Sequence, residues 1–358
     1  MSPYEIQTIR KLIFRCDGAA LPEIGTGHIV RNIAIADCFV ARKICHQSEI
    51  SFVLRTDGPF SVGCDLVKQS GYQIEIVDDD RLEWNSPEEA KVLIDFDPTL
   101  LIIDRLSTEL AWMTNLKSSL RCVVSMDDTG DGASLADVVI NAILHDIPVG
   151  ESRYIGYDYL FFKSINASVK IEVPEKANRI VASFGGYDHR NLMGFFLNNL
   201  QDNNVLLENY TVVELLVGAE SNELIERWTK QAEQVSLKYD IHVRLMISPP
   251  DFLERLAQAD LAVLSGGLTI FDAVSLGVPS IGLPQYRHQL NTIRNLEAKV
   301  AVRAGSIEMD LDQVHFARIF DQMMCSREER YLLKKLGPSL IDSKGSERVI
   351  DILSSLVY

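Results

Sequence analysis

The chain has 358 residues, of which 47% are hydrophobic, and its formal net charge at pH 7 is −15. This length favours two domains, each with a hydrophobic core of its own. A protein that binds nucleic acid needs a basic face, and this acidic composition does not indicate one, so we expect no nucleic-acid partner. The acid excess does not forbid a local basic pocket for a phosphorylated ligand.

The cysteines and the apolar runs bear on the compartment. Six cysteines are scattered without C-x-x-C spacing, which argues against a zinc site and a disulfide framework and favours a reducing cytoplasm: Cys16, Cys38, Cys45, Cys64, Cys122 and Cys325. The first ten residues lack the apolar core of a signal peptide. No apolar run approaches the roughly 18 residues of a spanning helix, so we expect no transmembrane segment. The oligomeric state is not indicated.

In the first half of the chain, short apolar runs alternate with helix-like segments. The runs predict strands at residues 12–14, 50–54, 73–77, 100–104, 123–126 and 138–141. Helices are expected at residues 28–44, 61–70 and 108–118. The strand runs are continuously apolar, which suits a parallel sheet covered on both faces. One run ends in Asp104 and another is followed by Asp127, at the sheet edge where open α/β sheets bind ligands.

The second half repeats this alternation after a mixed segment, 163–178, which is expected to be the interdomain linker. Strands are predicted at residues 179–184, 211–216, 242–246, 261–264 and 280–283. Helices are predicted at 191–200, 222–236, 249–259, 268–276 and 288–299, followed by a helical tail at 312–357. Two βα-repeating halves predict an α/β protein with two Rossmann-like domains, 1–165 and 166–358, facing each other across a cleft.

A glycine-containing loop, residues 24–28 (Ile-Gly-Thr-Gly-His), joins the first strand to the first helix. Gly25 and Gly27 allow a tight turn and the close approach of a ligand. The loop directs free N–H groups and the positive end of the helix dipole at that ligand. This end disfavours imidazolium, so His28 is expected to be neutral and able to accept a proton. The alternative is a tight turn with a solvated histidine.

A second loop of this kind, residues 265–272, precedes a helix in the second half. Gly266 and Gly267 at the helix start can form an anion site from backbone N–H groups. The hydroxyl of Thr269 can reach a phosphate oxygen, and Asp272 can accept hydrogen bonds from ribose hydroxyls. The alternative is structural, with Ser265 as the helix cap and the others as ordinary first-turn residues.

Several motifs of this sequence resemble those of one enzyme superfamily. Residues 266–273, Gly-Gly-Leu-Thr-Ile-Phe-Asp-Ala, with Leu-Gly-Val-Pro at 276–279, resemble the nucleotide-binding signature of GT-B glycosyltransferases related to the peptidoglycan UDP-GlcNAc transferase. Residues 14–17 and 24–31 resemble a narrower branch, the UDP-sugar hydrolase of pseudaminic acid biosynthesis and the related spore-coat polysaccharide proteins. Further matches follow in family order, from residue 12 to about 300: 101–104, 127–128, 140–141, 156–160, 183–186 and 191–192.

The resemblance implies a GT-B fold whose C-terminal domain holds UDP while the sugar projects toward the N-terminal loop. In the hydrolase, water attacks the sugar and UDP leaves, and neither a cofactor nor a metal is needed. The catalytic histidine of the family corresponds to His28, which we expect to activate the water. Asp17, earlier on the same loop, could orient His28 or position the water, and a loop-capping role is its alternative.

The matched motifs also supply the expected ligand contacts. Those to phosphate and sugar come from Arg15, Gly25, Gly27, His288 and Gln289. Those to the nucleotide come from Gly185, Gly186, Gly266, Gly267, Leu268, Thr269 and Asp272. The helix N-termini at Gly27 and Gly267 would stabilise charge on the departing diphosphate.

The sequence departs from the family pattern at three places. Asp272 stands where the family usually has Glu, so the carboxylate has a shorter reach toward ribose. Arg287-His288-Gln289 stands where the hydrolases usually read Glu-Asn-Gln, so the identity of the sugar is not determined by the resemblance. Arg287 and His288 could supply positive charge toward the diphosphate or form an exposed polar turn. Tyr187 stands where Thr or Ser is commoner.

Three functions stay open on the sequence. The first, which the sequence favours, is hydrolysis of a UDP-linked diacetamido-trideoxy amino sugar in nonulosonic acid or surface polysaccharide biosynthesis. The second is a glycosyltransferase of the same fold that moves a sugar from a UDP donor to a polysaccharide or lipid acceptor. The third is a non-catalytic sugar-nucleotide-binding protein, against which His28 beside two glycines argues.

Overall fold

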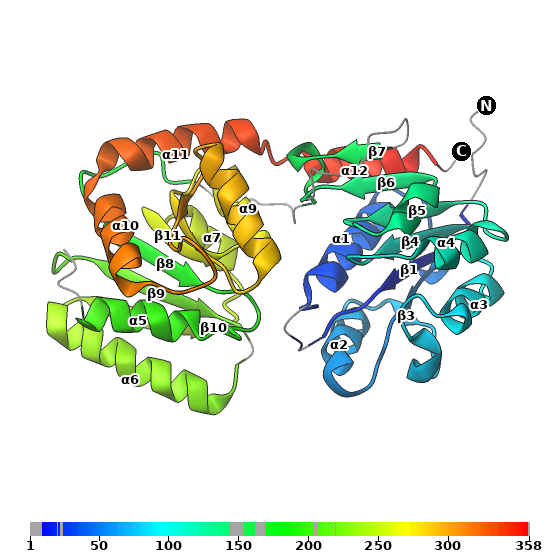
Figure 1. Cartoon of the computed structure of the whole chain (residues 1–358), viewed down its shortest axis with the longest axis horizontal. Helices are drawn as coiled ribbons and strands as arrows, with labels where there is room; N and C mark the ends of the chain where they lie inside the picture. The colour runs from blue at the N-terminus through cyan, green and yellow to red at the C-terminus, as the bar shows by residue number, and fades with distance from the viewer. Residues whose placement is uncertain are drawn as a thin grey trace. The chain divides into compact units, whose positions relative to one another are not determined.

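The computed structural model of the chain forms two compact units, shown as ribbons in Figure 1. It describes residues 9–19, 21, 24–143, 153–161, 169–202, 207–218 and 220–356. Unit 1 comprises residues 1–163 together with 343–358, and unit 2 comprises residues 164–342. The expected boundary at residues 165 and 166 lies outside the described residues.

Unit 1 is built on a parallel sheet with the strand order β3-β2-β1-β4-β5-β6-β7. The strands are β1 (Leu12–Cys16), β2 (Ile50–Val53), β3 (Gln73–Ile74), β4 (Leu100–Asp104), β5 (Val123–Met126), β6 (Val138–Asn141) and β7 (Arg153–Ile155). Strand β1 pairs with β4 at the centre of the sheet so that Cys16 lies opposite Asp104. The carboxyl ends of β1, β4 and β5 therefore meet at one edge.

Helices cover both faces of this sheet, because successive residues of each strand point to opposite sides. Phe14 and Ile102 pack in one core with helices α1 (Gly27–Ala41) and α2 (Ser61–Gln69). Ile13 and Ile103 pack in a second core with helices α3 (Pro87–Asp95) and α4 (Leu110–Lys117). The continuous apolar runs of the sequence are thus explained by burial on both sides.

Unit 2 repeats this architecture with a six-stranded parallel sheet of order β10-β9-β8-β11-β12-β13. Its strands are β8 (Arg179–Ser183), β9 (Val212–Val217), β10 (His242–Ile247), β11 (Leu261–Ser265), β12 (Ser280–Leu283) and β13 (Arg303–Ala304). Its helices are α5 (Leu192–Asp202), α6 (Asn222–Tyr239), α7 (Phe252–Ala257), α8 (Leu268–Ser275), α9 (Arg287–Ala298), α10 (Gln313–Cys325) and α11 (Arg327–Leu340). The prediction of an α/β chain with two Rossmann-like domains is confirmed.

The end of the chain belongs to a different unit from the one expected. The sequence assigned residues 166–358 to one domain, but α12 (Gly345–Ser354) packs in unit 1. Val349, Ile350 and Leu353 are buried in the core that also contains α1 and α2. The predicted single helical tail is three helices, and only α10 and α11 lie in unit 2.

The structure contains one α-helix and two strands that the sequence did not predict: α3, β7 and β13. The helix α3 carries a clear start signal, because Ser86 caps it by accepting a hydrogen bond from the backbone N–H of Glu89. The strands β7 and β13 are each at the edge of a sheet and have only three and two residues. Such short strands carry no periodic pattern.

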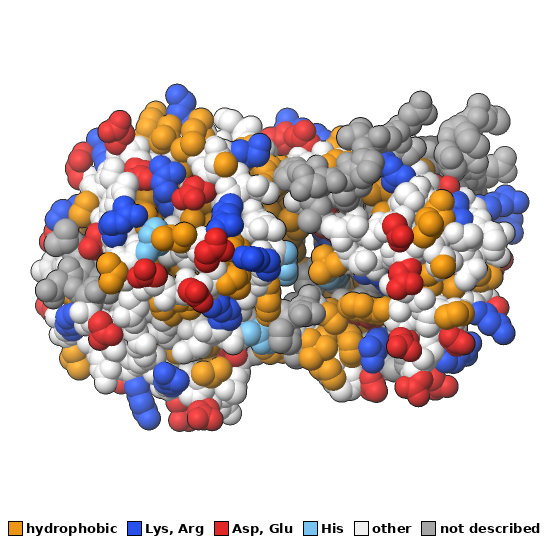
Figure 2. All heavy atoms as spheres, viewed as in Figure 1, with side chains coloured by type: hydrophobic (Ala, Val, Ile, Leu, Met, Phe, Trp, Pro, Cys, Tyr) orange, Lys and Arg blue, Asp and Glu red, His pale blue; other side chains and the backbone are white. Residues whose placement is uncertain are grey.

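The surface view in Figure 2 shows acidic and basic side chains interspersed over the face in sight. Within the part of the chain that the structure describes, none of the helices has the length and apolar character needed to cross a membrane.

Candidate functional site

The loop between β1 and α1 brings His28 to the carboxyl edge of the unit 1 sheet. Gly25 has a φ of +59°, a left-handed conformation that glycine adopts without strain. The helix α1 begins at Gly27, and the N-cap residue Thr26 forms no side-chain hydrogen bond to the helix. His28 therefore lies in the first turn of α1, as the motif predicts, at a helix start without a side-chain cap.

Asp104, the last residue of β4, holds His28 in place. Its Oδ1 lies 2.6 Å from Nδ1 of His28. Arg31 and Asn32 donate to the same carboxylate at distances of 2.6 to 2.9 Å. Asp104 is 1% exposed, whereas 17% of the His28 side chain is exposed. The imidazole is therefore anchored at one nitrogen and open to solvent at its other side.

The charge of Asp104 determines which nitrogen of His28 can accept a proton. Burial raises the pKa of Asp104, but Arg31 and His28 outweigh it and hold that pKa well below its usual range. An ionised Asp104 accepts from Nδ1–H, so Nε2 carries the lone pair. Nε2 has no hydrogen-bond partner among the residues that the structure describes. This geometry suits a general base for a hydroxyl group or water.

Arg31 links Asp104 to a second buried carboxylate. Its Nη1 donates to Asp127, which follows β5 in a left-handed conformation with φ of +50°. Oδ1 of Asp127 also accepts a hydrogen bond of 2.8 Å from the backbone N–H of Ala142. The two carboxylates and one guanidinium sum to one negative charge. Through Asp104, this cluster places a negative charge beside the imidazole of His28.

Asp17 and Arg15 form a buried structural pair, contrary to the roles that the motifs suggested for them. Arg15 has no exposed surface, and its guanidinium lies 2.7 Å from Glu89 and 2.8 Å from Asp17. Asp17 is 5% exposed and accepts hydrogen bonds from the backbone of Arg55 and from Nε1 of Trp84. Arg15 therefore has no surface to offer a phosphate or sugar. The carboxylate that orients His28 is the one at the end of β4.

In unit 2, the loop between β11 and α8 places two glycines at the helix start. Gly267 is the N-cap of α8 and no side chain caps this helix, so Ser265 does not have the capping role of the structural alternative. A Cβ atom on Gly266 would lie 2.6 Å from the backbone oxygen of Gln289, so glycine is needed for the starts of α8 and α9 to approach. Beside Gly267 there is more room, because its nearest neighbours would be 3.7 Å from a Cβ.

Two buried polar side chains border Gly267. Ser265 is 3% exposed and Gln289 is 7% exposed. The atoms nearest to a Cβ on Gly267 would be Nε2 of Gln289, at 3.7 Å, and Oγ of Ser265, at 3.9 Å. Neither atom has a hydrogen-bond partner in the described part of the chain, while Oε1 of Gln289 accepts from the backbone of Gln285. Both atoms are therefore available to donate a hydrogen bond to an anion at the start of α8.

Asp272 lies one turn into α8 and is half-buried. Its carboxylate has no hydrogen bond to the described residues, and burial raises its pKa to about 7. Thr269 is half-buried in the first turn, and Leu268 is 37% exposed. A carboxylate without a protein donor is suited to a ligand that supplies hydroxyl groups. The nucleotide contacts expected of these three residues stay predictions.

The loop after β8 borders the same helix start. Gly185 has a φ of +87°, and a Cβ there would lie 3.9 Å from Oγ of Ser265. The carbonyl oxygen of Gly186 would be 2.2 Å from a Cβ on Gly218, so these two loops pack backbone to backbone. On the other side, His288 is exposed in the first turn of α9. The sheet order places β11 between β8 and β12, which explains why the two loops flank α8.

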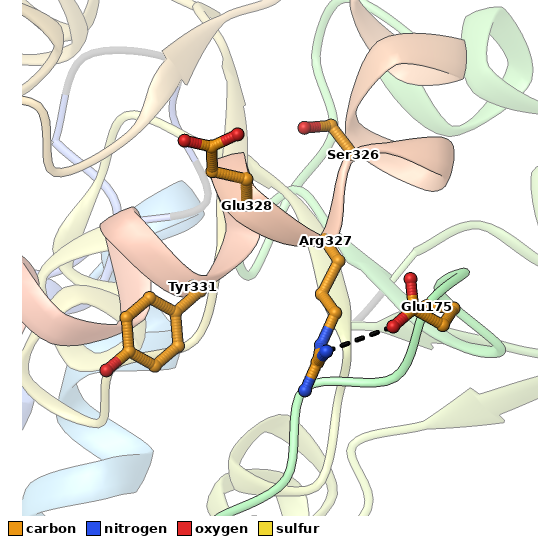
Figure 3. A pocket seen from close by; sticks show the side chains of 5 residues that line it. All are labelled: Glu175, Ser326, Arg327, Glu328 and Tyr331. Carbon is orange, nitrogen blue, oxygen red and sulfur yellow. Dashed lines mark hydrogen bonds and ion pairs between the residues drawn. The ribbon is translucent and has the colours of Figure 1, made fainter.

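A hollow in unit 2 lies away from these motifs. It has a volume of about 450 Å³ and is lined by Glu175, Ser326, Arg327, Glu328 and Tyr331 (Figure 3). Its residues precede β8 and begin α11, so it lies toward the amino edge of the sheet, and an Arg327–Glu175 ion pair of 3.0 Å occupies one wall. We assign no function to it. The described residues contain no group of three or more metal-ligating side chains.

No protein-family model matches the chain. The spore coat polysaccharide biosynthesis protein SpsG of Bacillus subtilis is 25% identical over 276 residues, which is 72% of this chain and 76% of SpsG. This similarity confirms the expected resemblance to spore-coat polysaccharide proteins.

Two solved structures illustrate the fold. MurG of Acinetobacter baumannii superposes with a TM-score of 0.67 at 13% identity, covering 96% of this chain and 98% of MurG. HepE of Anabaena, solved in complex with UDP, superposes with a TM-score of 0.59 at 13% identity, covering 96% of this chain and all of HepE. The chain therefore has the GT-B fold, with two Rossmann-like domains built on parallel sheets.

Proposed function

We propose that this protein is a GT-B glycosyltransferase that moves a sugar from a UDP donor to an acceptor hydroxyl in polysaccharide biosynthesis. The observation that carries the proposal is the pair of His28 and Asp104, which leaves Nε2 of the imidazole able to accept a proton. The similarity to SpsG supports a role in making a polysaccharide, and the UDP bound to HepE supports a uridine nucleotide.

In the proposed reaction, the acceptor hydroxyl gives its proton to Nε2 of His28 while its oxygen bonds to the anomeric carbon of the sugar. The bond between that carbon and the phosphate oxygen breaks, and UDP leaves with the electron pair. Asp104 pairs with the imidazolium that forms. In unit 2, the start of α8 with Ser265 and Gln289 binds the diphosphate, and Asp272 accepts from the ribose.

A second candidate, hydrolysis of a UDP-linked amino sugar, rests on the same base and on the motif at residues 24–31. Water would take the place of the acceptor hydroxyl, and His28 would activate it in the same way. The narrow resemblance of this motif to the pseudaminic acid hydrolase favours this candidate. The two functions differ in one requirement: the transferase needs an acceptor molecule to release UDP, and the hydrolase needs only water.

The test is to incubate the protein with a panel of UDP-sugars, including diacetamido-trideoxy sugars, and to measure UDP release with and without polysaccharide or lipid-linked acceptors. Release that needs an acceptor supports the transferase, and rapid release with free sugar as product supports the hydrolase. His28→Ala should abolish either activity, whereas His46→Ala, which changes an exposed histidine of unit 1, should leave it intact. Full activity of His28→Ala would refute both candidates.

A further inference from the structure

The loops after β8 and β12 meet through one buried side chain, Gln285. It is 5% exposed, and its Oε1 accepts a 3.0 Å hydrogen bond from the backbone N–H of His189. Its Nε2 donates to the carbonyl oxygens of Phe184 and Tyr187, and its own N–H donates to Gln289. Because β11 lies between β8 and β12 in the sheet, this junction spans the strand that leads into α8.

Four aromatic rings from these two loops form a row. The centroids of Tyr187 and His189 are 6.0 Å apart, those of His189 and Tyr286 are 6.1 Å apart, and those of Tyr286 and His288 are 5.6 Å apart. The first and last pairs are stacked, with interplanar angles of 24° and 16°. Each imidazole therefore lies against a tyrosine ring, while both histidines are exposed.

A second helix start accompanies the first at this edge. The N-cap of α9 is Tyr286, which makes no side-chain hydrogen bond to the helix, and His288 lies in the first turn. The close packing of Gly266 on the backbone of Gln289 brings the start of α8 next to this turn. Two uncapped helix starts on neighbouring strands offer sites for two negatively charged groups.

Positive side chains lie beside this row in a chain that is acidic as a whole. Arg190 follows His189 and donates to the carbonyl oxygen of Pro284 at 2.9 Å. Arg287 precedes His288 and pairs with the exposed Glu308 at 3.1 Å. An imidazole can donate a hydrogen bond to a phosphate oxygen in either charge state, and it adds a positive charge when protonated.

We infer that the row Tyr187, His189, Tyr286, His288 distinguishes a nucleoside diphosphate from a monophosphate, with the two imidazoles binding the second phosphate. This inference rests on the proposed function, because it assigns the nucleotide site to unit 2. The start of α8, with Ser265 and Gln289, binds one phosphate. The imidazoles and the start of α9 bind the other, which a monophosphate does not possess. Neither His189 nor the row as a unit was singled out by the sequence motifs.

The test measures the affinity of the full-length protein for UDP and for UMP by calorimetry. A charge-assisted hydrogen bond lost from each site predicts that His189→Gln and His288→Gln each weaken UDP about 10-fold or more, and UMP less than about 2-fold. His242→Gln, which changes an exposed histidine at the opposite edge of the same sheet, serves as the matched control and should bind both nucleotides as the wild type does.

Three results would overturn the inference. Equal losses of UDP and UMP would mean that the histidines shape the loops without distinguishing the second phosphate. Unchanged UDP affinity in both variants would mean that the imidazoles do not touch the diphosphate, while the proposed nucleotide site would stand. A wild-type protein that binds neither UDP nor UMP would remove the proposed function itself, and this inference with it.

Discussion

Replacing Asp104 by asparagine tests the proposed catalytic centre most directly, because it changes the charge that orients His28 and keeps the shape. The amide of asparagine does not carry the negative charge that stabilises the imidazolium. A hydrogen bond to a charged group contributes about 1.5–3 kcal/mol, and 1.36 kcal/mol corresponds to a tenfold rate change. We therefore expect kcat of Asp104→Asn to fall roughly 10- to 150-fold while the KM for the donor changes little.

The stability of the variant must be measured alongside its rate. Arg31 keeps Asp127 as a partner but loses one of its two carboxylates, and breaking a buried pair costs about 3–5 kcal/mol. Asp128→Asn is the matched control, since this carboxylate is also buried after β5 but accepts from Thr108, Ser125 and Gly130. It should lower stability and leave kcat of the folded protein unchanged.

The assay is UDP release at saturating donor, at a temperature where circular dichroism shows each variant folded. The reasoning is refuted if folded Asp104→Asn turns over within twofold of the wild type while His28→Ala is inactive. It is also refuted if Asp128→Asn loses as much kcat as Asp104→Asn.

Three further predictions concern stability. The pKa of Asp272 is raised to about 7, so the folded protein loses stability as this carboxyl ionises between about pH 4 and pH 7. Asp272→Asn should therefore increase the free energy of unfolding at pH 8 and leave it unchanged at pH 4. Urea titrations at both pH values check this. Gly266→Ala should lower the free energy of unfolding by about 1–3 kcal/mol, because its Cβ would clash with the backbone of Gln289, and Gly267→Ala should lower it by less. A larger loss for Gly267→Ala in the same titrations would contradict this packing. Ile350→Ala should lower the free energy of unfolding of unit 1 by about 2–5 kcal/mol, because it leaves a cavity in the core of that unit. Limited proteolysis of the variant should cut unit 1 first, and cleavage of unit 2 before unit 1 would contradict the prediction.

The local patterns of the sequence predicted the sheets and the helix starts well. Continuous apolar runs and the glycines before α1 and α8 are local signals, so β1, β4 and the positions of His28 and Gly267 could be read directly. The run ending in Asp104 was visible too, but its contact with His28 was not. His28 and Asp104 are 76 residues apart in the chain, and they come into contact only because β1 and β4 pair in register.

The wrong assignments also concern side chains whose partners lie far away in the sequence. Arg15 and Asp17 lie in a motif beside the loop that carries His28, and nothing local shows that Glu89 pairs with Arg15 inside the fold. Ser265 was visible as a possible cap, and only the helix start at Gly267 shows that its hydroxyl is left for another partner. Side chains that serve a site through distant contacts need the tertiary structure to be assigned.

The position of α12 has a consequence for how the chain folds during synthesis. Unit 1 begins to emerge first, yet the face of its sheet that carries Phe14 and Ile102 is closed by Val349, Ile350 and Leu353. The whole of unit 2 is therefore translated before that face can be completed. While residues 164–342 are being made, the part of this apolar face that α12 covers stays exposed, and a chaperone or premature association would act on it in that interval.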